Sequence, residues 1–259
     1  MIGRLPHAAE SSSIALVRGA VVVTFLLVWE ALALSGVLLR DVVPRLEAIA
    51  AALSRVLVDG DFYANLATTA GEVGVSLLIG GVAGVAVGLL LGASRLLGAA
   101  FEPYLHYLGP TPKIIFFPIM ILWFGVGVGS KVAMGAISCF FPLALSVASG
   151  MRHIDPVLIR VGLSFGARPR HMVMKIYLPA IRQPLINGFR LGFGVSVIGV
   201  LLAETKLSNK GLGFMVIQSY AHFDIATMYA LVMLLFALAI IVNALITRFG
   251  RVTAWSFDS

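Results

Sequence analysis

The sequence contains little that could support catalysis, a covalent cross-link or a metal site. Its one cysteine, Cys139, rules out an intrachain disulfide and lies in an apolar run, where a small buried side chain is the expected role. The five histidines show no ligand spacing such as HExxH, and there is no Walker A loop and no nucleophile beside a base. Gly129-Ser130-Lys131 lacks the P-loop glycine spacing and is expected to be a tight outer turn. The sequence therefore predicts no catalytic residue, no cofactor and no metal.

Charge is also scarce. Of 259 residues, 12% are charged and 59% are hydrophobic, which excludes an ordinary soluble domain. Lys and Arg exceed Asp and Glu by 19 to 12, but the cations lie in short loops between apolar runs rather than in a basic patch with interleaved aromatics. We therefore predict an all-α integral membrane protein in contact with the lipid bilayer and with no nucleic-acid partner.

Apolar runs predict about six membrane-spanning helices. They cover residues 19–39, 73–93, 114–128, 132–150, 184–203 and 225–247. The third run is short and contains Pro118, so it is expected to extend backwards with a kink. Residues 40–69 are more polar and predict an amphipathic helix at the outer surface.

The positions of the cations predict that both termini face the cytoplasm. The segments are then a cytoplasmic stretch 1–18, a membrane domain 19–248 with a cytoplasmic loop 151–183, and a cytoplasmic tail 249–259. The predicted cytoplasmic cations, besides those of the loop, are Arg4, Arg18, Arg95, Lys113, Arg248 and Arg251, and the predicted external ones are Arg40, Arg45, Arg55, Lys131, Lys206 and Lys210.

Two of the predicted spans are rich in glycine. Gly80, Gly84, Gly88 and Gly92 recur every four residues and predict close packing against another helix, either in the same chain or in a second copy. The fifth span combines glycines with polar residues, which is typical of a bundle interior or of a path lining. From it we take Asn187, Gly192 and Ser196 as candidate path-lining residues.

The segment from Ile154 to Pro184 has clear helix start and stop signals. Asp155 before Pro156 predicts a helix start, and Gly166 predicts the end of that helix in a left-handed conformation. Pro169 can open a second helix, which Pro179 is expected to stop. On composition alone, this segment could also be a plain cytoplasmic loop that joins two spans.

The spacing within this segment resembles the cytoplasmic loop of ABC importer permeases. That loop reads Glu-Ala-Ala, three residues, Gly, nine residues and Ile-x-Leu-Pro; here Gly166 and Ile176-Tyr177-Leu178-Pro179 match, whereas Arg160-Val161-Gly162 replaces Glu-Ala-Ala. The resemblance implies a coupling helix that seats in a groove of an ATPase subunit. The implied coupling residues are Arg160, Val161, Gly162, Gly166, Ala167, Ile176, Leu178 and Pro179.

Two further stretches carry the resemblance. Leu122-Trp-Phe-Gly-Val-Gly127 is similar to the third-span region of permeases for nitrate, taurine and alkanesulfonates, and Glu204 followed by Gly211-Leu212-Gly213 also resembles this family. The resemblance implies a MetI-like type I ABC importer permease fold in the bacterial inner (plasma) membrane. It also implies a second permease copy, two copies of a separate ABC ATPase subunit and an external solute-binding protein, with no enzymatic activity in this chain.

The residues leave two alternatives to an ATP-driven permease. A secondary transporter or channel working without an ATPase should carry carboxylates within the membrane, and the apolar runs offer only Glu30, Glu72 and Glu204, all near predicted ends. An intramembrane enzyme would need a catalytic constellation, and the sequence contains none.

Overall fold

The computed structural model describes residues 7–36 and 42–252, and this part of the chain is helical, with no strand. Positions 1–6 and 253–259 of the predicted terminal segments lie outside the described residues, as does Arg40. The long helices are α1 (His7–Ser35), α3 (Gly60–Ala93), α6 (Val128–Arg152), α10 (Arg182–Lys206) and α12 (Ile225–Val252). The shorter elements are α2 (Leu46–Val58), α4 (Arg95–Leu108), η1 (Lys113–Phe116), α5 (Phe117–Phe124), α7 (Pro156–Ser164), α8 (Pro169–Met172), η2 (Val173–Tyr177), α9 (Leu178–Ala180) and α11 (Leu212–Ala221).

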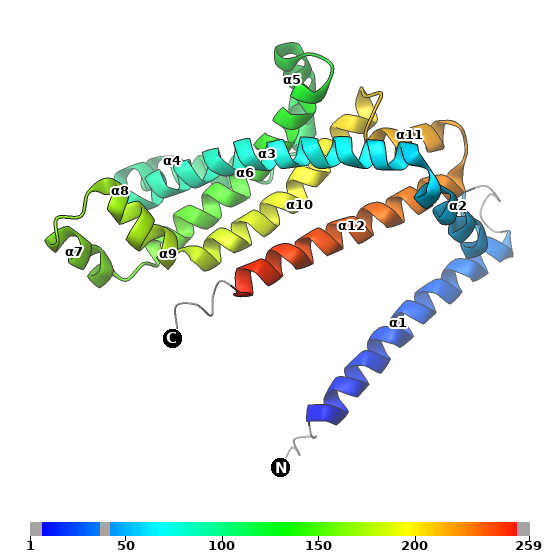
Figure 1. Ribbon diagram of the computed structural model, residues 1–259, viewed down its shortest axis with the longest axis horizontal. Coiled ribbons are helices and arrows are strands. Elements are labelled where there is room, and N and C mark those ends of the chain that lie inside the picture. The colour runs from blue at the N-terminus through cyan, green and yellow to red at the C-terminus, as the bar shows by residue number, and fades with distance from the viewer. Residues whose placement is uncertain (1–6, 37–41, 253–259) are drawn as a thin grey trace.

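The centre of the molecule is a layer of three long helices, in which α6 packs against both α3 and α10 (Figure 1). Among the helices able to cross a membrane, α6 has the largest buried share. Its buried residues are mostly small, such as Ala144 and Ala148, which allows the neighbouring helices to approach closely. This layer is the scaffold on which both ends of the molecule are built.

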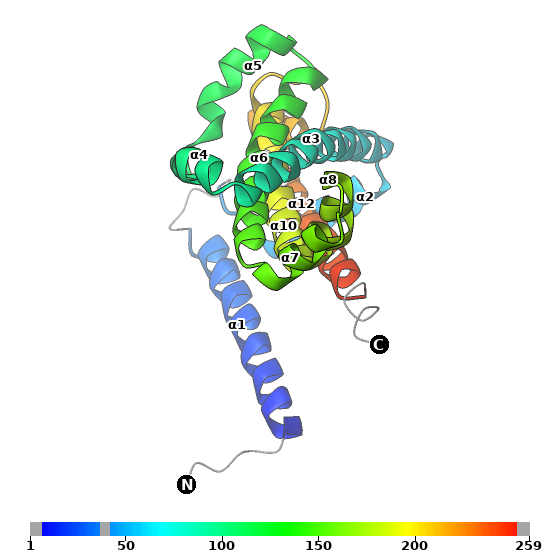
Figure 2. The ribbon, with the colours of Figure 1, turned by 90° about the vertical axis from the view of Figure 1, so that its left-hand side faces the viewer.

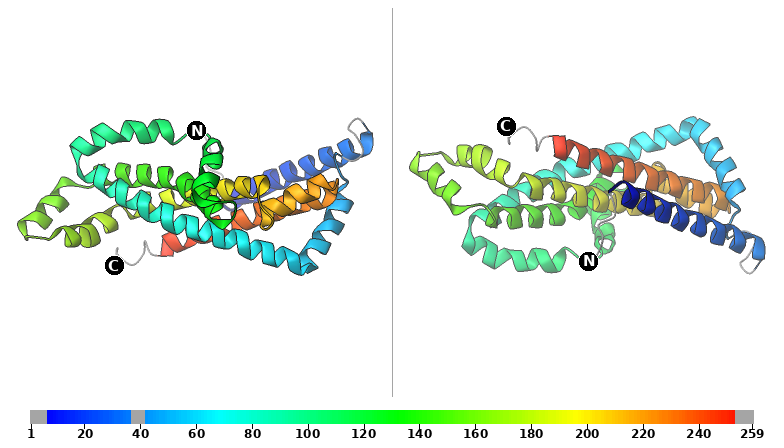
Figure 3. Two further views of the ribbon diagram at one scale, coloured as in Figure 1. Left: turned by 90° about the horizontal axis from the view of Figure 1, so that it is seen from above. Right: turned by 90° about the horizontal axis from the view of Figure 1, so that it is seen from below.

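The two ends of the bundle differ. At one end α7 and α8 project as a hairpin beyond the long helices, and at the other end α2 crosses them and α11 lies alongside them (Figures 1 and 3). Helix α1 leans away from the bundle (Figure 2), and none of the residues in its most apolar stretch is buried. Near the C-terminal end of α1, Trp29 packs edge-to-face on Tyr229 of α12 and donates a 3.1 Å hydrogen bond from Nε1 to the Pro44 carbonyl. Helix α1 therefore has a defined anchor at one end.

The prediction of an all-α membrane fold is confirmed. Within residues 7–36 and 42–252, five helices are long and apolar enough to cross a membrane, and there are six spans if α4 with η1 and α5 counts as one broken span. The break is a 92° bend at Gly109-Pro110-Thr111-Pro112, whereas Pro118 lies in the first turn of α5, where proline is tolerated.

Two other boundaries differ from the prediction. The second span starts at Gly60, capped by Asp59, and not near residue 73, because Thr69 and Glu72 turn their polar groups into the protein. The helix that contains the first span starts at His7 and ends at Ser35, whereas the predicted span was 19–39.

Candidate functional site

Hydrogen bonds between residues close in sequence define both ends of α7, the first helix of the hairpin made by α7 and α8. The Val157 N–H donates to Asp155 Oδ1 at 2.8 Å, so Asp155 caps the first turn of α7. At the other end Gly166 has φ +66°; its N–H donates to the Leu163 carbonyl, and the Ala167 N–H donates to the Gly162 carbonyl. These two bonds form a Schellman motif, which needs a left-handed residue at the position of Gly166.

A close approach at Gly162 holds the two arms of the hairpin together. A Cβ at this position would overlap Ile176 Cδ1 and lie 2.7 Å from Met172 Sδ. Gly162 stands where the family pattern has its second alanine, so the departure from Glu-Ala-Ala at this position has a packing reason.

The prediction that Pro179 stops the second helix is wrong. After α8 the chain forms the π-helical turn η2, in which the Leu178 N–H donates to the Val173 carbonyl, and Pro179 then lies inside the short helix α9. Proline in a regular helix clashes with the carbonyl four residues earlier, here that of Lys175, and the wider π-turn relieves this clash. The chain turns at Ile181 before α10 starts.

The hairpin has a packed root and an exposed tip. Near the root, Tyr177 and Leu178 pack against a buried cluster of Val147, Met151, Ile154 and Ile181. At the tip, Phe165 is 87% exposed, and Val161 and Leu163 are also exposed. Arg160, Arg168 and Arg170, which are close to these apolar residues in the sequence, are exposed as well. The tip is therefore a mixed apolar and cationic surface on a rigid base.

The four-residue glycine ridge of α3 lies against α6 of the same chain. Added Cβ atoms would lie 2.9 Å from the Phe140 carbonyl oxygen at Gly84 and 2.6 Å from Val147 Cβ at Gly88. At Gly80 and Gly92 they would overlap the Ala136 carbonyl oxygen and Met151 Cβ, respectively. The ridge thus fixes the distance between α3 and α6, and α6 is the helix that leads into the hairpin.

A buried polar cluster joins the helices at the opposite end. Glu204, which is fully buried, accepts from Thr69 Oγ1 at 2.7 Å and from the Gly213 N–H at 2.6 Å. The Leu212 N–H donates to Thr69 Oγ1 at 2.8 Å, and a Cβ at Gly211 would overlap the Glu204 carboxylate. The Glu and Gly-Leu-Gly pattern is therefore one structural unit that holds the start of α11 on α3 and α10.

The same end contains a buried ion pair that the sequence did not indicate. Lys131 Nζ lies 3.0 Å from Glu72 Oε1, with side-chain exposures of 4% and 2%. Lys131 was expected in a tight outer turn, and it lies instead in the first turn of α6, where it is buried. A lysine and a carboxylate 59 positions apart give no local signal, and only the packing of α3 on α6 brings them together.

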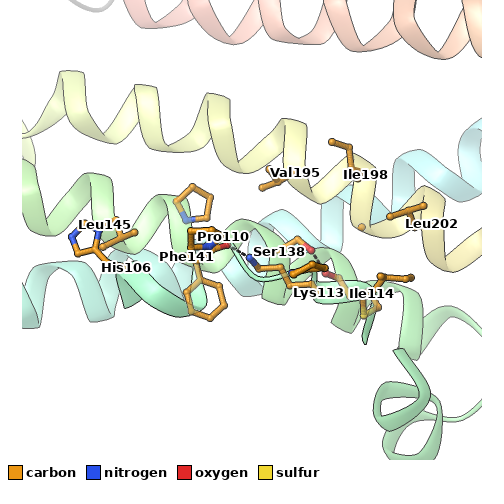
Figure 4. A pocket seen from close by; sticks show the side chains of 15 residues that line it. His106, Pro110, Lys113, Ile114, Ser138, Phe141, Leu145, Val195, Ile198 and Leu202 are labelled. Carbon is orange, nitrogen blue, oxygen red and sulfur yellow. Dashed lines mark hydrogen bonds between the residues drawn. The ribbon is translucent and has the colours of Figure 1, made fainter. Parts of the chain in front are cut away.

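A cavity of about 600 Å³ opens between α4, α6, α10 and the bend at Gly109–Pro112 (Figure 4). Lys113, Ser138, Phe141 and Ile198 are among its lining residues. Lys113 was predicted at the cytoplasmic end of a span, but here it faces residues near the midpoints of α6 and α10.

The candidate path-lining residues do not line this cavity. On α10 its wall is formed by Val195, Ile198 and their neighbours, whereas Ser196 is fully buried and Gly192 packs on Cys139. Asn187 is exposed nearer the hairpin end of α10. Their role in a transport path remains a prediction.

The architecture is similar to that of a solved transporter. A chain of the MetNI methionine ABC transporter in inward-facing conformations superposes with a TM-score of 0.63 at 21% sequence identity, covering 71% of this chain and 92% of that one. The fold is therefore that of a type I ABC importer permease.

The sequence comparisons define the family. Residues 80–253 match the family model for the inner membrane component of binding-protein-dependent transport systems, and the chain belongs to this family. Relatives include a putative aliphatic sulfonates transport permease, SsuC of Bacillus subtilis (27% identity; 74% of this chain, 70% of that protein), and the taurine transport permease TauC of Escherichia coli (30%; 64% and 60%). A formylaminopyrimidine transport permease, ThiX of Halalkalibacterium halodurans, is 26% identical over 74% of this chain and 76% of its own length.

The chain is thus a multi-pass inner membrane permease subunit of an ABC importer, which works with an ATPase on a separate chain and with a solute-binding protein. The predictions of family, fold and function class are confirmed, and a secondary transporter or channel is not favoured.

Proposed function

We propose that this permease imports a small organic or inorganic solute of the nitrate, sulfonate or taurine type, delivered by an external binding protein. The proposal is supported by relatives named for aliphatic sulfonates and taurine. The Leu122–Gly127 segment supports the same branch. The ThiX relative, named for formylaminopyrimidine, is the reason for keeping the solute class this broad.

Coupling to the ATPase runs through the hairpin. The observation that carries this is the exposed tip, where the Gly166 Schellman motif fixes the backbone next to Phe165 and where Arg160 and Arg168 are also exposed. A surface that exposes an aromatic side chain and several cations suits a groove with an apolar floor and an acidic rim. Arg160 stands where the family pattern has a glutamate, and its positive charge makes the tip more complementary to an acidic rim. A rigid base also transmits a displacement of the tip to the long helices. Leu178 and Pro179 lie where this base joins α10.

The complete importer contains two permease copies and two ATPase subunits, with both termini in the cytoplasm. In support of a second copy, α1 and the projecting helix α5 expose apolar faces away from their own bundle, including Trp123 at 70% exposure (Figure 2). The orientation is supported by the cations on the hairpin, which by the positive-inside rule face the cytoplasm.

A pull-down of the tagged chain from its native membrane, in mild detergent and with identification of bound proteins by mass spectrometry, tests the coupling proposal. Wild type should recover an ATPase with a P-loop. Gly166→Val should insert normally but lose much of that recovery, because a β-branched residue in the left-handed region costs about 1–2 kcal/mol or more and would unfold the motif. Gly166→Asn is the matched control, since asparagine tolerates this conformation. Recovery of the chain alone, or equal recovery by both variants, would contradict the coupling role.

A further inference from the structure

The cavity between α4, α6 and α10 contains a cation with no acidic partner. Lys113 Nζ donates to the Gly109 carbonyl, to the Thr111 carbonyl at 3.2 Å and, at the limit of hydrogen bonding, to the Leu108 carbonyl at 3.4 Å. It also lies 5.0 Å from the centre of the Phe141 ring. These three carbonyls can accept from all three N–H donors of the ammonium group but carry no net charge, so an anion would be attracted by the charge and would replace the weakest contact, the one to Leu108. In the described part of the chain, no carboxylate oxygen lies within 4.0 Å of it, in contrast to Lys131.

The rest of the cavity wall is mostly apolar. Ile114, Val195, Ile198 and Leu202 surround the space in front of Lys113 (Figure 4). Ser138 adds one hydroxyl group, which donates to the Met134 carbonyl at 2.7 Å, so its oxygen can still accept a hydrogen bond. Lys113 is partly buried, and solvent screens its charge less in these mostly apolar surroundings than in water, so an anion in the cavity is attracted to it.

We propose that this cavity is a solute site within the membrane, in which Lys113 holds the head group of a monovalent organic anion and the apolar wall holds its short carbon chain. The volume of about 600 Å³ suits a small molecule. A single cation matches one negative charge, and the apolar wall disfavours a strongly hydrated dianion. This inference rests on the proposed function, since a transport path is what would bring solutes to this depth.

The competing explanation is that Lys113 only closes the carbonyl end of α4, where a cation is favourable. In both roles the charge lies beside the cavity, so the two differ in whether an anion is held there, which protection of a reporter cysteine by added anions shows. Ile198, which is 57% exposed and lies on the cavity wall, is a suitable reporter position. The native Cys139 is 1% exposed, so wild type without the reporter serves as the blank.

The first experiment uses the full chain in native membrane vesicles with Ile198→Cys. Two methanethiosulfonate reagents of similar size, one a sulfonate and one a trimethylammonium, are compared by their rates of reaction. Adding Lys113→Met should lower the ratio of anionic to cationic rates by about tenfold, because removal of one nearby charge acts oppositely on the two reagents. Lys113→Arg should keep the ratio. Arg190→Met is the matched control, because Arg190 pairs with Asn243 of α12 and does not line the cavity.

The second experiment measures protection of the same cysteine from the neutral reagent methyl methanethiosulfonate. Butanesulfonate and butyrate should slow the reaction in a concentration-dependent way, whereas neutral butanamide should not, and Lys113→Met should abolish the difference. Protection by one anion alone would identify sulfonate or carboxylate as the preferred head group. An unchanged reagent ratio in Lys113→Met, equal protection by butanamide, or no protection by either anion would overturn the proposal. These readouts need no ATPase, so a failed pull-down would count against the coupling proposal separately.

Discussion

Removing the cation of the buried Lys131–Glu72 pair should destabilise the protein more than removing both partners. Lys131→Met leaves the Glu72 carboxylate buried at 2% exposure, without the ammonium group 3.0 Å away. Its other oxygen, Oε2, already has no hydrogen-bond partner among the described residues. Breaking a buried pair from one side costs about 3–5 kcal/mol, whereas replacing both partners by neutral groups of similar shape is often close to neutral.

These energies translate into measurable shifts. For a chain of this size 1 kcal/mol corresponds to about 2–4 °C in Tm, so Lys131→Met should lower the apparent Tm by roughly 6–20 °C. The double variant with Glu72→Gln should recover at least about half of that loss. Thermal unfolding is followed in detergent at one fixed scan rate, because membrane proteins often unfold irreversibly.

The control is Lys206→Met, which removes an exposed lysine at the same end and should change the Tm by no more than about 2 °C. If the double variant is as unstable as the sum of the two single variants, Lys131 and Glu72 do not stabilise each other, and the reasoning from burial fails.

Two further substitutions test the packing and the capping described above. Gly88→Leu should cost at least about 3 kcal/mol and give aggregated protein on gel filtration, because its Cβ would lie 2.6 Å from Val147 Cβ. The control is Gly74→Leu on the same helix, which should remain monodisperse because no atom lies within 4 Å of a Cβ there. Equal behaviour of the two variants would contradict the packing of the ridge on α6. Asp155→Ala should cost about 1 kcal/mol and speed amide hydrogen exchange at Val157, which donates to the Asp155 carboxylate; unchanged exchange would mean that the cap does not stabilise α7.

The features that the sequence predicts well are those set by neighbouring residues. The start of α7 at Asp155 and its end at Gly166 follow from capping chemistry within a few positions, so the hairpin could be outlined in advance. The six apolar runs could also be counted, because a span is recognised from consecutive residues whose combined length matches the thickness of a bilayer.

The features that the sequence does not predict depend on distant partners. The glycine spacing on α3 indicates a close contact, but it does not say that the contact is with α6 of the same chain. Lys131 and Lys113 look alike as loop lysines next to glycine or proline, yet one pairs with Glu72 and the other faces a cavity. Their environments are fixed by packing between helices, which leaves no periodic trace in the sequence.

The start of the second span shows a related limit. Polarity at Thr69 and Glu72 suggests a segment outside the membrane, but both residues are inside α3 and turn toward other helices. A hydropathy run cannot separate a polar residue facing protein from one facing water. The same ambiguity explains why the glycine-rich face of α10 did not reveal which of its residues line the cavity.

The π-turn η2 also takes up one residue of chain length within the hairpin. In a regular helix each residue advances the chain by about 100° around the axis, whereas a π-turn accommodates one extra residue as a local bulge. Deleting one residue within Val173–Tyr177 would therefore restore a regular helix and leave the exposed tip with Phe165 pointing in nearly its present direction relative to α10. A deletion in the first turns of α10 would instead turn the whole hairpin by about 100°. The π-turn is thus the part of the hairpin in which the chain can shorten by one residue without changing the direction of the tip.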